Sequence, residues 1–192
     1  MLIKITSGVA STLILLLACA ACLPAWGQQQ SGDSGQRLAF LGIEGTLPAG
    51  WQAQTPGSHM RLAQYRIPGP PDAQMVVYYF GPGQGGSLED NTARWRSQFT
   101  DNMGDPVEPA ISRLRDSDPI VTLVELHGNY ARGMGMGSDN PVKADHALLA
   151  AVVETPRGNA YIQLWGPEAT VSKASAAYLE FLKGLKPGVD SK

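Results

Sequence analysis

Short β-forming runs, each bounded by turn residues, follow one another along most of the sequence. Residues 60–67 alternate, so that Ala63, Tyr65 and Ile67 fall on one face of an extended strand. Residues 75–80 form an uninterrupted apolar run, which is typical of a strand covered on both faces. Glycine and proline residues at 69–72 lie between the two runs and favour a turn. The two runs therefore predict a β-hairpin.

Further runs of the same kind extend the pattern. They are residues 38–47, 120–127, 147–154 and 160–165. The last two are separated only by residues 155–159, which contain proline, glycine and asparagine and predict a second hairpin. Because hairpins join neighbouring antiparallel strands, we expect a mainly antiparallel sheet.

Two segments have the periodicity of helices. In residues 87–101, side chains that suit a packed face recur at intervals of three and four residues: Leu88, Thr92, Trp95 and Phe99. Ser87 precedes them as a good N-cap, because its hydroxyl can accept a hydrogen bond from a free amide of the first turn. A second apolar stripe predicts a helix that begins near Pro167 and ends before Pro187. Strands and helices together predict an α+β domain, in which a mainly antiparallel sheet is packed by two long helices in a layered sandwich.

The N-terminal segment has the pattern of a signal peptide. Lys4 provides a short basic start, and residues 9–17 form an apolar stretch that is too short to span a bilayer as a helix. Ala25 and Gly27 are small residues suited to signal peptidase, and a polar run follows them. We therefore expect residues 1–27 to be a signal peptide and the rest to be exported, to the periplasm or out of the cell.

Both cysteines lie inside this N-terminal segment. Residues 16–19 resemble a bacterial lipobox, in which Cys19 would become the lipidated first residue of the protein. The four residues that end at Cys22 fit that pattern less well, because a cysteine replaces the usual leucine. A lipid-anchored product is therefore the alternative to soluble export. In both cases the folded domain has no internal disulfide, so hydrophobic burial must stabilise it.

The remaining sequence has the size of one domain. We expect residues 28–36 to be a flexible polar segment, 37–186 a single α+β domain and 187–192 a polar tail. Loss of Lys4 with the signal peptide leaves 14 basic residues against 17 acidic ones, a net charge of −3. A nucleic-acid surface needs clustered basic residues, so we expect no nucleic-acid partner, and membrane contact only through a lipid anchor.

The chain resembles a group of secreted proteins of Gram-negative and related bacteria in three segments. These read MRLAQYRIPGPPDAQMVVYYFGPGQGGSLEDNTARWRSQF, GNYARGMGMG and ALLAAVVETPRGNAYIQLWGPEATV. The order of the elements is also similar to the layered fold of the PsbP family of extrinsic photosystem II subunits. The resemblance implies a PsbP-like architecture and a role in binding or assembly, and it transfers no site residues.

A glycine-rich loop at residues 81–87 joins a predicted strand to a predicted helix. Backbone amides at a helix N-terminus can hold an anion, which gives a speculative ligand site of five residues: Gly83, Gly85, Gly86, Ser87 and Arg94. The loop lacks the lysine of a phosphate-binding P-loop, and Glu89 and Asp90 would repel a phosphate. The alternative is a structural loop in which glycine provides unusual backbone angles.

Two methionines in a glycine run, Met134 and Met136, are the speculative metal ligands of the chain. Thioether sulfur is a soft ligand that suits Cu(I), and His127, His146 or Met60 could complete such a site. The alternative is a hairpin tip whose methionines cover the edge of the core. A copper-binding accessory protein is therefore an alternative function, and we expect no cofactor.

The sequence identifies no catalytic residues. No Gly-x-Ser-x-Gly elbow and no zinc-hydrolase signature occurs. Glu125 and His127 share one face of their strand, and with the loop at residues 81–87 they are the basis of an alternative interpretation as an envelope enzyme. The first interpretation is a non-enzymatic domain of the cell envelope that binds a small ligand or an unidentified envelope protein.

Overall fold

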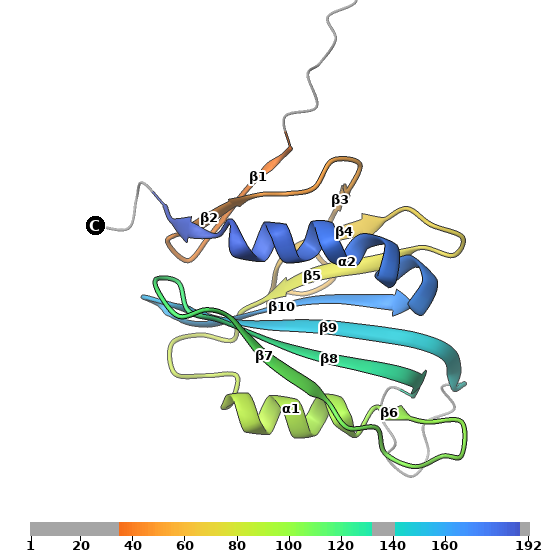
Figure 1. Cartoon of the computed structure of the whole chain (residues 1–192). Helices are drawn as coiled ribbons and strands as arrows, with labels where there is room; N and C mark the ends of the chain where they lie inside the picture. The colour runs from red at the N-terminus through yellow and green to blue at the C-terminus, as the bar shows by residue number, and fades with distance from the viewer. Residues whose placement is uncertain (1–34, 132–140, 189–192) are drawn as a thin grey trace, which may run out of the picture. The chain divides into compact units, whose positions relative to one another are not determined.

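The computed structural model describes residues 35–131 and 141–188. The chain divides into two compact units, Met1–Gly32 and Asp33–Lys192, and every described residue belongs to the second. This unit combines an eight-stranded sheet, a three-stranded sheet and two helices (Figure 1). Every described strand pairing is antiparallel. The predicted α+β class with a mainly antiparallel sheet is therefore confirmed.

The large sheet has the strand order β3-β4-β5-β10-β9-β8-β6, and β7 also pairs with β8. Its strands are β3 (Gln52–Gln54), β4 (Arg61–Ile67), β5 (Ala73–Tyr78), β6 (Phe99–Thr100), β7 (Ala110–Arg115), β8 (Val121–Tyr130), β9 (Lys143–Thr155) and β10 (Gly158–Pro167). Both predicted hairpins are present, as β4-β5 and β9-β10. The sequence did not predict the short strands β3 and β6 or the exposed strand β7.

The small sheet consists of β1 (Arg37–Phe40), β2 (Ile43–Thr46) and β11 (Lys186–Pro187). Residues 38–47, which the sequence predicts as one strand, turn back on themselves as the hairpin β1-β2. The reversal takes place at Leu41 and Gly42, whose φ angles are 50° and 80°. Both central residues of such a tight turn need positive φ, and only one of them here is a glycine.

The helices are α1 (Leu88–Arg96), of nine residues, and α2 (Glu168–Lys183), of sixteen residues. The expectation of two long helices is wrong, because both are short. The predicted helix 87–101 ends early, since the chain leaves the helix after Arg96 and the backbone of Phe99 and Thr100 pairs with β8. The predicted N-cap at Ser87 is present.

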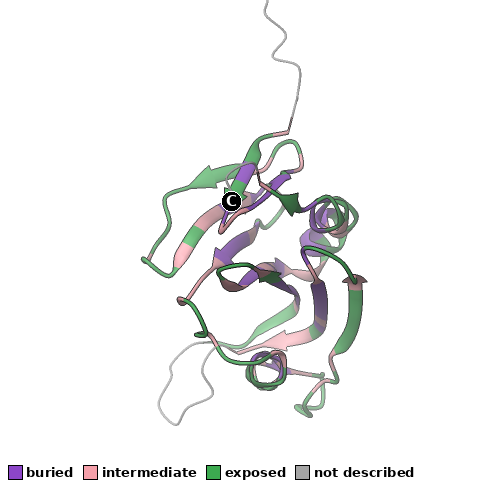
Figure 2. Ribbon diagram, turned by 90° about the vertical axis from the view of Figure 1, so that its left-hand side faces the viewer, coloured by how far each residue is buried: buried purple, intermediate pink, exposed green. Residues whose placement is uncertain are grey.

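Alternation along the central strands creates one core on each face of the large sheet. On one face, α2, which contributes Tyr178, and the small sheet cover residues such as Leu149 and Ile162. On the other face, α1 covers residues such as Val124 and Tyr161. Figure 1 shows the two helices on opposite sides of the sheet, and Figure 2 shows that the buried residues concentrate in the strands between them. Each central strand therefore contributes side chains to both cores.

Because α1 is short, it packs mainly against β8. In the described segments no other helix lies on this face of the sheet. The side chains of β5 and β10 that point to this face include Tyr78, Gln163 and Trp165, and all three are only half-buried. The uncovered part of the α1 face is where the candidate site lies.

Candidate ligand-binding site

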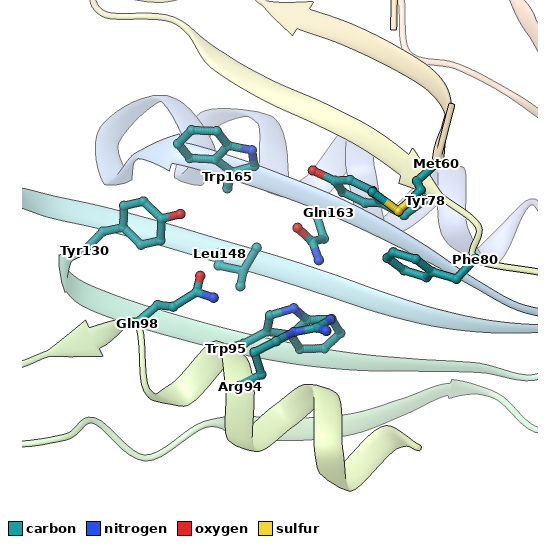
Figure 3. A pocket seen from close by; sticks show the side chains of 10 residues that line it. All are labelled: Met60, Tyr78, Phe80, Arg94, Trp95, Gln98, Tyr130, Leu148, Gln163 and Trp165. Carbon is teal, nitrogen blue, oxygen red and sulfur yellow. The ribbon is translucent and has the colours of Figure 1, made fainter. Parts of the chain in front are cut away.

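A cavity of about 300 Å³ lies between α1 and the uncovered part of the sheet. Its described lining includes five aromatic residues: Tyr78, Phe80, Trp95, Tyr130 and Trp165. The other lining residues are Met60, Arg94, Gln98, Leu148 and Gln163. Figure 3 shows Leu148 and Gln163 in the middle of the hollow, with Trp165 and Tyr78 on one side and the α1 residues Arg94 and Trp95 on the other. Small-molecule sites have this composition, with ring and apolar surfaces and a few convergent polar groups.

Strand alternation explains why rings gather in this hollow. Along β10, Ile162 and Leu164 point into the α2-side core, so Gln163 and Trp165 point to the other face. Along β5, Met75 and Val77 point into the α2-side core, so Tyr78 points to the face of the cavity. The strands β5 and β10 are neighbours, with Tyr78 paired to Tyr161 and Gln74 paired to Trp165. Side chains from different strands therefore meet on one rigid surface.

The rings support one another as well as line the cavity. The centroids of Tyr78 and Phe80 lie 6.2 Å apart in a stacked pair, and those of Tyr130 and Trp165 lie 5.7 Å apart. Trp95 is 2% exposed and contacts Tyr161 edge to face. Contacts of this kind restrict the motion of the rings, so little side-chain entropy would be lost if a ligand bound there.

One basic group lines the cavity, and two others lie against its rings. Arg94 lines it, and its guanidinium donates to the amide oxygen of Asn91. The guanidinium of Arg61 lies 5.6 Å from the ring centroid of Tyr78, and the ammonium of Lys143 lies 5.7 Å from that of Trp165. Cations placed in this way are attracted by the electron-rich faces of aromatic rings.

A second hollow of about 510 Å³ adjoins the first, and Trp165 lines both. Its polar lining includes Lys143, His146 and the ion pair of Arg66 with Asp72, whose nitrogen and oxygen lie 2.5 Å apart. Hydrogen bonds from the Gly69 amide and the Arg66 guanidinium lower the pKa of Asp72. The carboxylate of Asp72 is therefore ionised at neutral pH and compensated by Arg66.

The glycine loop is held from beneath by two side chains. Asn91 donates to the carbonyl oxygens of Gly85 and Ser87 at 2.7 and 2.8 Å, and the Tyr161 hydroxyl donates to that of Gly86 at 2.8 Å. Gly83, which is exposed, and the other glycines of the loop do not line the aromatic cavity. These contacts give the loop a packing role, while anion binding by its amides stays a prediction.

A carboxylate of α1 itself lies at the N-terminus of the helix. Ser87 and Asp90 form a capping box, in which the Asp90 amide donates to the Ser87 hydroxyl and the Ser87 amide donates to the Asp90 carboxylate, both at 3.1 Å. These hydrogen bonds lower the pKa of Asp90. Among the sequence-predicted site residues, the structure places Arg94 in the cavity and connects it to the glycine loop through Asn91.

Glu125 and His127 lie on β8 on the face opposite the cavity. His127 contacts Glu168 at the start of α2, with Nδ1 and Oε1 3.1 Å apart. In the described part of the chain, Glu125 and His127 form no hydrogen bond with each other. The structure therefore does not bring the pair together with the glycine loop.

The other residues singled out in the sequence, Met134, Met136, Cys19 and Cys22, lie outside the described residues. Within residues 35–131 and 141–188, no three His, Cys, Asp or Glu side chains cluster as metal ligands would. His146 stacks on Tyr130, with centroids 6.2 Å apart, and Met60 lines the aromatic cavity.

Sequence reasoning missed most of the cavity. Tyr78 and Trp165 occur in runs that predict buried strands, and Trp95 occurs in the apolar stripe of a helix. The available signal was the alternation of Gln163 and Trp165 with Ile162 and Leu164, which puts an amide and an indole on the same face. That pattern shows which residues share a face, but not that α1 leaves the face open.

Comparison with known proteins supports the fold. No family model and no curated protein matches the chain. Among solved structures, the chain is similar to the solution structure of cyanobacterial PsbP from Synechocystis sp. PCC 6803, with a TM-score of 0.53 and 17% sequence identity. The match covers 81% of this chain and 93% of that one.

At this identity the likeness shows a PsbP-like fold, which the sequence resemblance implied, and it does not extend to a group of secreted bacterial proteins. No helix in the described segments has the length and apolar character needed to cross a membrane.

Proposed function

We propose that the chain is a non-enzymatic accessory domain that binds a small ligand with a flat apolar body. The observation that carries the proposal is the cavity of about 300 Å³ with five aromatic rings in its lining. Flat ring systems stack on aromatic side chains, and each ring pair contributes about 0.5–1.5 kcal/mol beyond the buried area. The amides of Gln98 and Gln163 provide hydrogen-bonding groups that orient such a ligand.

The resemblance to the PsbP family, whose layered fold the chain shares, implies a role in binding or assembly and so supports an accessory function. The signal-peptide pattern of residues 1–27 supports the further proposal that the domain acts after export, in the periplasm or outside the cell. Cleavage after Gly27 and lipidation at Cys19 or Cys22 give products of different mass. The mass of the mature protein distinguishes between these alternatives.

Binding can be tested with N-phenyl-1-naphthylamine, an uncharged probe whose fluorescence rises in apolar surroundings. We expect saturable binding to the wild-type protein. Trp165→Ala removes a ring from the cavity wall and should weaken binding about tenfold.

Trp51→Ala is the matched control, because it removes an indole that packs on the opposite core and stacks on Tyr178 at 6.5 Å. It should change the dissociation constant less than about twofold once folding is verified by circular dichroism. Absence of saturable binding, or an equal loss in both variants, would contradict the proposed site.

A further inference from the structure

In the described segments, three basic side chains line or flank the aromatic cavity. Arg94 lines it, and Arg61 and Lys143 lie against two of its rings. Of the described residues that line the cavity, none is an aspartate or a glutamate. The described ion pairs likewise include no carboxylate bound to Arg61, Arg94 or Lys143. These three basic groups are therefore available to attract a negatively charged ligand.

Two nearby acids of the described segments, Asp90 and Asp72, are engaged elsewhere. Asp90, one turn before Arg94 on α1, accepts hydrogen bonds from the amide and hydroxyl of Ser87. Asp72, in the adjoining hollow, is paired with Arg66. Neither carboxylate forms an ion pair with the basic groups of the aromatic cavity.

Arg94 is positioned by the helix that carries it. Its guanidinium donates to the Asn91 side chain, which is 1% exposed and is itself fixed by the carbonyl oxygens of Gly85 and Ser87. A guanidinium has five N–H donors, and Asn91 is the one described acceptor. The remaining donors can bind an anionic group of a ligand that occupies the cavity.

We infer that the cavity selects organic anions, in which a flat apolar body carries one carboxylate, sulfonate or similar group. The body lies among the rings and the anionic group lies beside Arg94, with Lys143 and Arg61 adding to the attraction. This inference rests on the proposed function and adds the charge of the ligand to it.

Two probes that share one ring skeleton test the inference. 8-Anilino-1-naphthalenesulfonate carries an anionic group, and N-phenyl-1-naphthylamine has the same rings without it. Dissociation constants of both are measured by fluorescence for the wild type, Arg94→Gln and Arg113→Gln. Arg113 lies on the exposed strand β7, so its variant loses the same charge away from the cavity.

We expect Arg94→Gln to weaken binding of the sulfonate about three- to tenfold and to change binding of the uncharged probe less than about twofold. Arg113→Gln should affect neither probe. An unchanged sulfonate affinity in Arg94→Gln, or equal losses for both probes, would overturn the inference while the proposed function stands.

Failure of the wild type to bind either probe would instead reject the proposed function. If circular dichroism shows that Arg94→Gln is not folded, Lys143→Gln tests the charge that lies against Trp165, at an exposed position. A loss of sulfonate binding alone in Lys143→Gln supports the inference. The inference is overturned if both probes bind Lys143→Gln as tightly as they bind the wild type.

Discussion

Gly85 leaves no room for a side chain beside the aromatic rings of Tyr161 and Phe80. Its φ is 95°, and a Cβ placed there would lie 2.7 Å from Cε2 of Tyr161 and 2.9 Å from Cδ2 of Phe80. Gly85→Ala therefore adds backbone strain and a steric clash, and it should lower the free energy of unfolding by about 2–4 kcal/mol. Urea denaturation followed by circular dichroism measures the change.

Gly83 offers the matched control two residues earlier. Its φ is 66°, and no atom would lie within 4 Å of an added Cβ. Gly83→Ala should lower the free energy of unfolding only by the backbone strain, about 1–2 kcal/mol. Both substitutions restrict the unfolded chain alike, so the difference between them reports the contact with Tyr161 and Phe80. Equal costs would show that the loop moves away from the rings.

For single residues, the sequence predicted roles that depend on neighbours in the chain better than contacts with residues that are distant in the chain. It predicted Ser87 as a cap because capping depends on residues that are adjacent in the chain. It singled out Arg94 for a place near the loop, but its position across the cavity from Trp165 depends on strands that are distant in sequence. Contacts of the second kind depend on sheet order, which one sequence does not specify.

Among the elements, α1 depends on an ionised cap. The pKa of Asp90 is lowered by its hydrogen bonds to Ser87, so folding favours the charged carboxylate. Its contribution to stability is present above the ordinary pKa of an aspartate and is lost as the pH falls through the lower folded-state value, below about pH 4. Asp90→Asn should therefore lose less stability than the wild type between pH 6 and pH 3, as measured by urea denaturation.

Asp116→Asn is the control for this experiment. Asp116 is exposed and makes no hydrogen bond in the described segments, so its removal should leave the wild-type pH dependence in place. The role assigned to the cap would be contradicted if Asp90→Asn followed the wild-type pH dependence too.

Elements with a clear burial pattern were predictable. The alternation of β4 and the reversal between β9 and β10 are visible in the sequence, because half-burial and turn residues leave local signals. The strand β7 has mostly exposed residues and so lacks an apolar period. The turn between β1 and β2 places Leu41 at positive φ, where asparagine or glycine is usual. Tertiary packing, rather than local preference, determines these two features.

For the whole described unit, we expect stability to decrease from the centre of the large sheet to its edges. The strands β9 and β10 are paired on both sides and contribute to both cores. Their amides should exchange hydrogen only when the whole unit unfolds. The strands β3 and β11 are short, exposed and paired on one side, so their amides should exchange much faster. Hydrogen exchange with mass spectrometry resolves these segments.

Exchange in β10 at the rate of β3 would contradict this gradient. It would mean that the floor of the aromatic cavity opens locally, since Gln163 and Trp165 belong to β10. Slow exchange in β10 supports a cavity built on the most stable part of the molecule, where the positions of the rings are retained in the absence of a ligand.

The small sheet also determines how the unit responds to a mechanical pull. Both β1 and β11 are antiparallel to the central strand β2, with Arg37 opposite Thr46 and Pro187 opposite Ile43. The first residue of β1 and the last of β11 therefore lie at opposite ends of β2. A force that draws these two residues apart acts along the strands and loads their hydrogen bonds in shear. The hydrogen bonds of each strand pair must then break together rather than one after another. The three-stranded sheet therefore resists tension between these two residues.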